Sequence, residues 1–294
     1  SGIGRVGYYT NDFRGAEEAF HESIYYLSQT GNKAARINAL SALGYIRFGL
    51  DDYMEALALL EEALQLVEGE TDPESVEARI NIITYICAML CFTGNITRAN
   101  DLAVHAVRDS IRVNRRSSRL QAYIIWAMTE YFRGNYQKTL QICEENDEFA
   151  NKLQVRFWSS LKDLLQAMSY LAIGNLDASW NFLAQVEDRQ KNYPTEKIAM
   201  HAWKVKGDFF RMLGERDKAA QYYRELISDP ARNFTTIDSR FTLGTMLLSD
   251  GNAEGMVWLM EAIREADEQH LVGIALRART VKAVSLATSD TLET

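Results

Sequence analysis

Few residues in this chain have the types and spacing that covalent or metal chemistry requires. Cys87 and Cys91 lie four residues apart on one face of an expected helix, a spacing that two metal ligands could use. No Cys or His nearby in the sequence supplies the other ligands, and free buried cysteines are common in protein cores. The string Gly2-x-Gly4-x-x-Gly7 fits a dinucleotide-binding fingerprint, but no strand precedes it. We therefore expect no metal and no cofactor.

The histidines and carboxylates form no catalytic pattern either. His21, His105, His201 and His270 are scattered, and no Ser or Cys nucleophile sits in a recognisable motif with one of them. The acidic runs are typical of solvated helix faces, and nothing pairs them as an acid and a base. These observations argue against an enzyme.

The composition is that of an acidic, proline-poor chain. A formal net charge of −8 over 294 residues argues against direct contact between this domain and nucleic acid. With only three prolines, an all-helical fold is favoured. Three cysteines without framework spacing indicate a reducing compartment, so we expect a cytoplasmic location. We find no signal peptide and no apolar run approaching the ~18 residues that cross a bilayer, so no membrane contact is expected.

A turn signal recurs through the chain at a near-constant interval. Gly94, Gly134, Gly174 and Gly214 are each 40 residues apart. Looser versions extend the series, which places the hinges near residues 11, 51, 94, 134, 174, 214 and 251. Glycine can adopt the left-handed conformation that ends one helix, and the Asn that follows several of these glycines can cap the next helix. The interval therefore predicts stacked helix-turn-helix units.

Small residues flank the hinges at fixed distances. Seven positions before the hinges stand Gly4, Gly44, Cys87, Ala127, Ala167, Gly207 and Gly244. Five positions after most of them stand Ala16, Ala56, Ala99, Thr139, Ser179 and Ala219, but the last unit has Met256 there. Such pairs let two antiparallel helices cross closely. The expected fold is all-α, a right-handed α-solenoid of about seven helix-turn-helix repeats with a period of about 40 residues.

These residues resemble the tetratricopeptide repeat (TPR). Trp203-x-x-x-Gly207, followed by Gly214 and Ala219, is similar to the TPR signature. The period is longer than the usual ~34 residues. In this respect the chain resembles the superhelical sensor domains of bacterial signal-transduction ATPases, including maltose-activator-like regulators of the LuxR type. The resemblance implies one TPR-like superhelical domain over residues 1–294.

The same resemblance implies a ligand-binding groove, because the first helix of each TPR unit lines the concave face. The expected groove set is polar at its N-terminal end, apolar in the middle and ionic near the sixth unit. It comprises Asn38, Tyr45, Asn81, Gln121, Met128, Tyr131, Met168, His201, Lys204, Asp208 and Arg211. Two alternatives stay open: core packing for the middle of the set, and an intrahelical ion pair for Lys204 with Asp208.

A basic patch stands out in this otherwise acidic chain. It consists of Arg108, Arg112, Arg115, Arg116 and Arg119, around an expected loop between repeats. Guanidinium groups at this density could bind phosphate, nucleic acid or an acidic partner surface. The alternative is a solvated loop with local salt bridges.

Three functions from different classes remain. The leading one is the sensor or regulatory part of a multidomain bacterial signalling or transcription regulator, with a peptide, a protein or a small effector in the groove. The second is a constitutive protein-interaction scaffold, and the third, least favoured, is an enzyme. A terminal amphipathic helix is expected over about residues 267–286, where it caps the array or contributes to a homo-oligomer. We also expect the natural polypeptide to continue on at least one side.

Overall fold

The computed structural model describes residues 22, 24–26, 31–113, 115–147, 156–192 and 195–290, and these form helices and short turns without strands. The expected hinge near residue 11 and the Gly2–Gly7 string lie outside these residues. The helices are α3 (Lys33–Gly49), α4 (Tyr53–Val67), α5 (Pro73–Thr93), α6 (Ile96–Val113), α7 (Arg116–Phe132), α8 (Tyr136–Glu145), α10 (Arg156–Ala172), α11 (Leu176–Asn192), α12 (Glu196–Met212), α13 (Arg216–Ile227), α14 (Phe234–Ser249), α15 (Glu254–Glu268) and α16 (Val272–Asp290).

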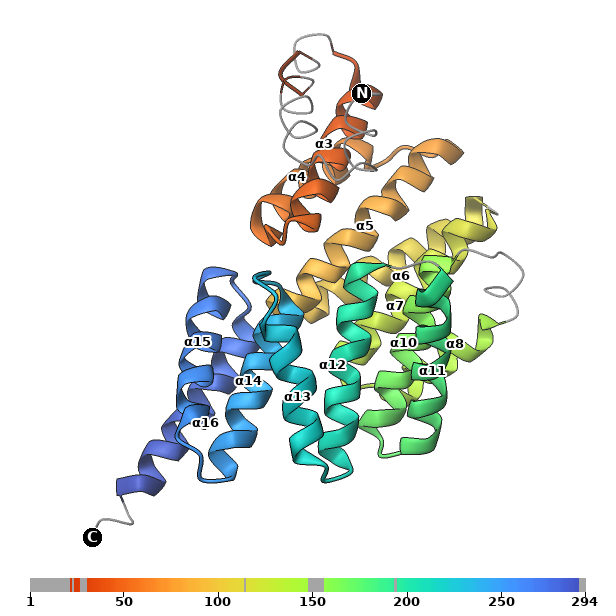
Figure 1. Ribbon diagram of the computed structural model, residues 1–294. Coiled ribbons are helices and arrows are strands. Elements are labelled where there is room, and N and C mark those ends of the chain that lie inside the picture. The colour runs from red at the N-terminus through yellow and green to blue at the C-terminus, as the bar shows by residue number, and fades with distance from the viewer. Residues whose placement is uncertain are drawn as a thin grey trace. The chain divides into compact units, whose positions relative to one another are not determined.

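The helices belong to two compact units. The first comprises Ser1–Cys91 and Asn95–Thr129, and the second comprises Phe92–Gly94 and Glu130–Thr294. In the first unit α3 packs against α4. In the second, α10 pairs with α11, α12 with α13 and α14 with α15, and α16 packs against α15 (Figure 1). This pairing confirms the helix-turn-helix repeat, whereas one continuous superhelical domain stays a prediction.

The hinge prediction is confirmed by the backbone. Left-handed φ angles occur at Gly94 (94°), Gly134 (81°), Gly174 (81°), Gly214 (80°), Gly251 (75°) and Asp51 (64°). The capping prediction is correct for only some units. The Asn175 side chain accepts a hydrogen bond from the Ala178 amide at 3.1 Å, as a capping residue should. Asn135 instead donates its side-chain amide to Glu130 at 2.6 Å and makes no capping bond.

The paired small residues do meet at the helix crossings. The Cys87 thiol lies 3.2 Å from the Ala99 carbonyl oxygen, and the Ser179 hydroxyl donates to the Ala167 carbonyl at 2.9 Å. All four residues have no solvent-exposed surface. Seven before the hinge and five after it is therefore the register of the contact between the two helices of one repeat.

The last pair departs from this register. Gly244 meets Gly255 rather than Met256, which was the residue expected from the spacing. The two helices also begin differently. The Gly255 and Met256 amides donate to the carbonyls three positions before them, Asn252 and Ala253, whereas the Ala219 amide of α13 donates to Glu215, four positions before it. The small-on-small contact is thus preserved with two glycines.

Helix α5 departs from the expectation that no segment of the chain is long and apolar enough to cross a membrane. Its 21 residues contain an 18-residue window with a mean hydropathy of 1.4, long and apolar enough to cross a membrane by composition alone. Of that window, 61% is buried inside the protein. Arg79 of α5 also forms a buried ion pair with Asp109 of α6 at 2.8 Å and donates to the carbonyl of Val67 at 3.2 Å. These contacts are those of a core helix.

The terminal helix begins later than expected. Asp267 and Glu268 still belong to α15, and His270, with φ of 56°, makes the turn before α16 begins at Val272. The apolar face expected for this helix comprised Leu271, Ala275, Ala278, Val281 and Ala283. The first three are buried, whereas Val281 is half-buried and Ala283 is exposed. The boundary was misplaced because no glycine marks this turn.

Candidate functional site

A cluster of charged side chains joins three helices of the second unit. Lys204 and Asp208 lie one turn apart on α12, and their ion pair is 2.8 Å long. The intrahelical ion pair that the sequence suggested is therefore present, but it is only part of the cluster. Lys204 also contacts Asp238 of α14 at 2.9 Å, and the other oxygen of Asp238 contacts Arg277 of α16 at 2.9 Å. The cluster therefore links the first helices of successive repeats.

The cluster is buried at its centre and accessible at its rim. The side chains of Lys204 and Asp238 are 12% and 13% exposed, whereas that of Arg277 is 55% exposed. Arg277 lies over the ring of Phe241, with 4.8 Å between the guanidinium carbon and the ring centroid. Arg211, also largely exposed, lies 3.8 Å from Asp208. Three cations thus face two carboxylates, which leaves a positive charge at the accessible edge.

Mutual attraction keeps the central groups ionised despite their burial. Burial opposes the charge of Lys204, but Asp208 and Asp238 together raise its pKa above the ordinary value. Burial likewise opposes ionisation of Asp238, but Lys204 and Arg277 lower its pKa. The Tyr223 hydroxyl donates to Asp208 at 2.7 Å, which satisfies that carboxylate further. The cluster is therefore a fixed arrangement of charges at neutral pH.

An aromatic group lies next to these charges in the same unit. The rings of Phe92 and Phe234 are stacked, with 4.6 Å between their centroids. The ring centroid of Phe132 lies 6.0 Å from that of Phe92 and 5.9 Å from that of Phe234. The ring centroid of His201 on α12 lies 6.5 Å from that of Phe92, and the His201 Nδ1 atom is 2.9 Å from the Thr235 hydroxyl oxygen. Apolar rings beside oriented charges are the usual composition of sites that bind small molecules or peptides.

His201 predicts a specific pH dependence of stability. Burial, with the charges of Lys197 and Lys204, lowers the pKa of His201 to about 4. Because the unfolded pKa is near 6.5, the unfolded state binds more protons between these pH values. Stability is then fully present above the unfolded pKa and is lost as the pH falls towards 4.

We expect this loss to be about 3 kcal/mol between neutral pH and pH ~4. Urea unfolding of the wild type and of His201→Gln over this range measures it, because other titrating groups are common to both proteins. The wild type should lose that much more unfolding free energy than the variant. Parallel pH profiles for the two proteins would contradict a buried neutral histidine.

The remaining groove residues lie in varied environments. In the first unit Asn38 is exposed and Tyr45 and Asn81 are half-buried, whereas Gln121 and Met128 are buried. Gln121 donates to the Thr84 hydroxyl at 2.9 Å, a bond within the core. In the second unit Met168 packs against a buried apolar cluster. A ligand-binding role for these residues stays a prediction.

Tyr131 is the other groove residue close to the charged cluster. Burial raises the pKa of its hydroxyl, and Lys204, Asp208 and Asp238 all act on it electrostatically. Of the predicted residues, Lys204, Asp208 and Arg211 are joined by ion pairs. Tyr131 and His201 lie within electrostatic range of the same charges.

Sequence reasoning missed the partners from the next repeats, Asp238 and Arg277. A usable signal existed for Asp238, because it lies on α14, the first helix of its repeat, and groove residues were expected on such helices. No sequence signal identifies Arg277 or Phe92.

The basic patch is on the first unit. Arg108 and Arg112 lie on α6, Arg115 precedes α7, and Arg116 and Arg119 lie in the first turns of α7. Arg115 forms ion pairs with Glu77 and, at 3.5 Å, with Glu74, which agrees with the local salt-bridge alternative for this one residue. The guanidinium carbon of Arg119 lies 5.7 Å from the ring centroid of Tyr123.

Reactive groups are not assembled in the part of the chain that the structure describes. There, no group of three His, Cys, Asp or Glu side chains is placed to hold a metal ion. Burial raises the pKa of Cys91 and Cys143 to about 12 each, and that of Cys87 well above its ordinary value, so these residues are thiols rather than thiolates.

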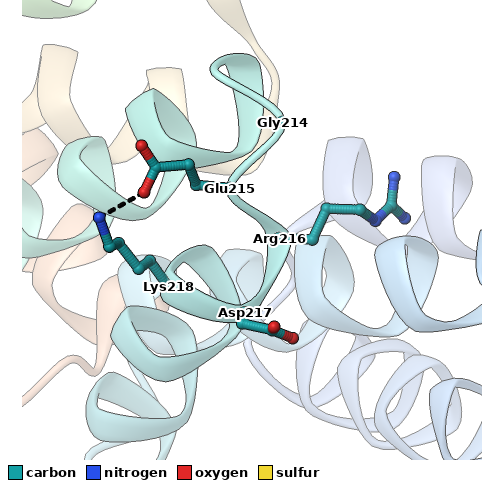
Figure 2. A pocket seen from close by; sticks show the side chains of 5 residues that line it. All are labelled: Gly214, Glu215, Arg216, Asp217 and Lys218. Carbon is teal, nitrogen blue, oxygen red and sulfur yellow. Dashed lines mark ion pairs between the residues drawn. The ribbon is translucent and has the colours of Figure 1, made fainter.

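A shallow depression at the turn between α12 and α13 has the composition of an ordinary surface turn. Its lining consists of consecutive residues, Gly214 to Lys218, and Figure 2 shows the ion pair between Lys218 and Glu215 across it. Arg216 points away from that pair, towards the next repeat, where it binds Asp250 at 2.8 Å and the Met246 carbonyl at 2.8 Å. These contacts stabilise the stacking of repeats.

No protein-family model matches the sequence, and no curated protein matches it. Several solved structures do. Apo RapI is 11% identical, with 95% of this chain and 96% of that chain covered and a TM-score of 0.65. The Rap conjugation gene regulator of plasmid pLS20, solved in complex with the Phr* peptide, is 10% identical, with 93% and 74% covered and a TM-score of 0.70.

A third match is a signal-transduction ATPase (STAND) protein with a TPR sensor from Pyrococcus horikoshii. It is 14% identical, with 98% of this chain and 46% of that chain covered and a TM-score of 0.55. At such identities the likeness shows the fold alone. The chain therefore has the TPR-like helical-repeat fold that its hinge spacing predicted.

Proposed function

We propose that this chain is a non-catalytic binding domain that recognises a peptide or protein segment at the charged cluster of its second unit. The observation that carries the proposal is the exposed edge of that cluster. The guanidinium groups of Arg277 and Arg211 keep free hydrogen-bonding capacity there. Their ion pairs with Asp238 and Asp208, which Lys204 joins, hold these two guanidinium groups in place. Preorganised charges beside aromatic rings can orient the polar groups of a peptide while the rings take its apolar side chains.

We further propose that binding has a regulatory role, as the sensor part of a signalling or transcription regulator. Two fold relatives support this: a Rap gene regulator solved with a peptide, and an ATPase with a TPR sensor. A cytoplasmic setting is part of the proposal and is supported by three buried free cysteines. The second candidate, a constitutive scaffold, would use the same surface without a change of conformation.

The test uses two arginines of the same helix. A synthetic library of short peptides is screened on the full chain, and the best binder is titrated calorimetrically against Arg277→Gln and Arg279→Gln. Both arginines are about half exposed, but Arg279 pairs with Asp267, outside the cluster. We expect Arg277→Gln to weaken binding roughly tenfold, equivalent to about 1.4 kcal/mol, and Arg279→Gln to leave it unchanged.

Equal effects of the two substitutions, or a library without any binder, would contradict the proposed site. Hydrogen exchange of the peptide complex separates the two candidate roles. A sensor should show altered protection in helices that do not contact the peptide, whereas a scaffold should show it only at the contact.

A further inference from the structure

The basic patch of the first unit carries charge that its surroundings do not neutralise. Asp109 is the acidic residue nearest to Arg112, at 3.8 Å, but Asp109 is buried and already bound by Arg79 at 2.8 Å. The Arg112 side chain is 77% exposed. Arg108 and Arg116 are also exposed, and the described residues offer them no ion pair. Three guanidinium groups are therefore available around the junction of α6 and α7.

The arginines at the start of α7 do not stabilise that helix. The N-terminus of a helix carries partial positive charge, so acidic residues stabilise the first turn and basic residues oppose it. Helix α7 nevertheless begins with Arg116, directly after Arg115, and its first turn contains no acidic residue. Residues that oppose local stability are expected where a site serves binding. An anionic partner would relieve this repulsion.

An apolar side chain within the patch indicates the class of partner. Ile111 is 56% exposed and lies three residues after Arg108 on α6, hence beside Arg108 on the helix surface. An exposed apolar residue among arginines is typical of protein interfaces, where arginine is enriched. It would add nothing to the binding of a phosphate backbone.

The charge around the patch limits the size of an anionic partner. Residues 31–107 contain eleven acidic and five basic side chains, a net charge of −6. A nucleic acid extending beyond the patch would meet this acidic surface, whereas a short acidic segment could cover the patch alone.

We propose that Arg108, Ile111, Arg112 and Arg116 form a docking surface for an acidic segment of a partner protein. The segment presents carboxylates to the three guanidinium groups, which can bind them in bidentate fashion. An apolar side chain between its carboxylates packs on Ile111. This surface is separate from the charged cluster of the second unit, so the two sites can be tested independently.

The experiment measures binding of a labelled acidic peptide by fluorescence anisotropy. The peptide has a central leucine flanked by glutamates, and the comparison peptide carries glutamine in place of glutamate. The triple variant Arg108→Gln/Arg112→Gln/Arg116→Gln is compared with Arg224→Gln/Arg264→Gln/Arg279→Gln, which removes the same charge elsewhere on the surface. Circular dichroism confirms that each variant folds.

We expect the patch triple variant to weaken binding roughly tenfold or more, and the control triple to change it less than about twofold. Ile111→Ser should weaken it about threefold, and the glutamine peptide should not bind. The proposal is overturned if the acidic peptide does not bind at low salt or if both triple variants lose affinity equally. Tighter binding of a DNA duplex or single-stranded RNA, or an unchanged affinity of Ile111→Ser, would also overturn it.

Discussion

Replacing Lys204 with Met should lower the free energy of unfolding by roughly 3 kcal/mol, near the lower limit for breaking a buried ion pair. Lys204 is the cation shared by Asp208 and Asp238, at 2.8 and 2.9 Å. Without it, two largely buried carboxylates face each other across the contact between α12 and α14. The loss stays near the lower limit because Arg277 still neutralises Asp238 at 2.9 Å.

Urea unfolding measures this effect, and Lys218→Met is the matched control. Lys218 forms an exposed ion pair with Glu215, and breaking such a pair costs less than about 1 kcal/mol. If the two substitutions cost the same, Lys204 does not stabilise the pair of carboxylates. The result also bears on binding studies, because a charge reversal at Lys204 would unfold the repeat and could be mistaken for loss of a ligand contact.

Gly255→Ala should be destabilising by about 3 kcal/mol, although alanine normally favours a helix. A Cβ atom at Gly255 would lie 2.6 Å from the Gly244 carbonyl oxygen and 2.7 Å from the Leu248 amide nitrogen. Both are backbone atoms of α14, so no side chain can rotate away. Helices α14 and α15 would have to separate.

Gly273→Ala on α16 is the control for this prediction. A Cβ atom there meets no other atom within 4 Å, so alanine should stabilise the helix by about 0.5 kcal/mol. Thermal or urea unfolding of both variants provides the comparison. A neutral effect of Gly255→Ala would contradict the close crossing of α14 and α15.

Local features of the fold were predictable because they depend on residues close in sequence. The glycines at 94, 134, 174, 214 and 251 needed no knowledge of the fold, since a left-handed residue followed by a new helix is a local arrangement. Errors occurred where the local signal was ambiguous. His270 turns the chain without a glycine, and Gly255 replaces Met256 at a helix start that has three-residue rather than four-residue hydrogen bonds.

The candidate site was only half predictable. Lys204 and Asp208 share one helix face, and their spacing alone indicates that they can pair. Asp238, 34 positions after Lys204, and Arg277, still further along, become neighbours only when α14 and α16 pack in register. The sequence also did not distinguish Asp109 from the other acidic residues. In the structure Asp109 is buried and paired with Arg79, so Arg112 has no accessible counterion there.

The order of residues along the chain was enough to predict a series of helical hairpins, the turns at 51, 94, 134, 174, 214 and 251, and the small residues that separate the two helices of most hairpins. Turn conformation, capping and helix periodicity are set by residues within a few positions of one another. Which charges are buried, which are neutralised and which remain available to a partner depended on the packing of distant helices. Charge pairing and desolvation depend on distances between repeats, and the stacking of the repeats sets those distances.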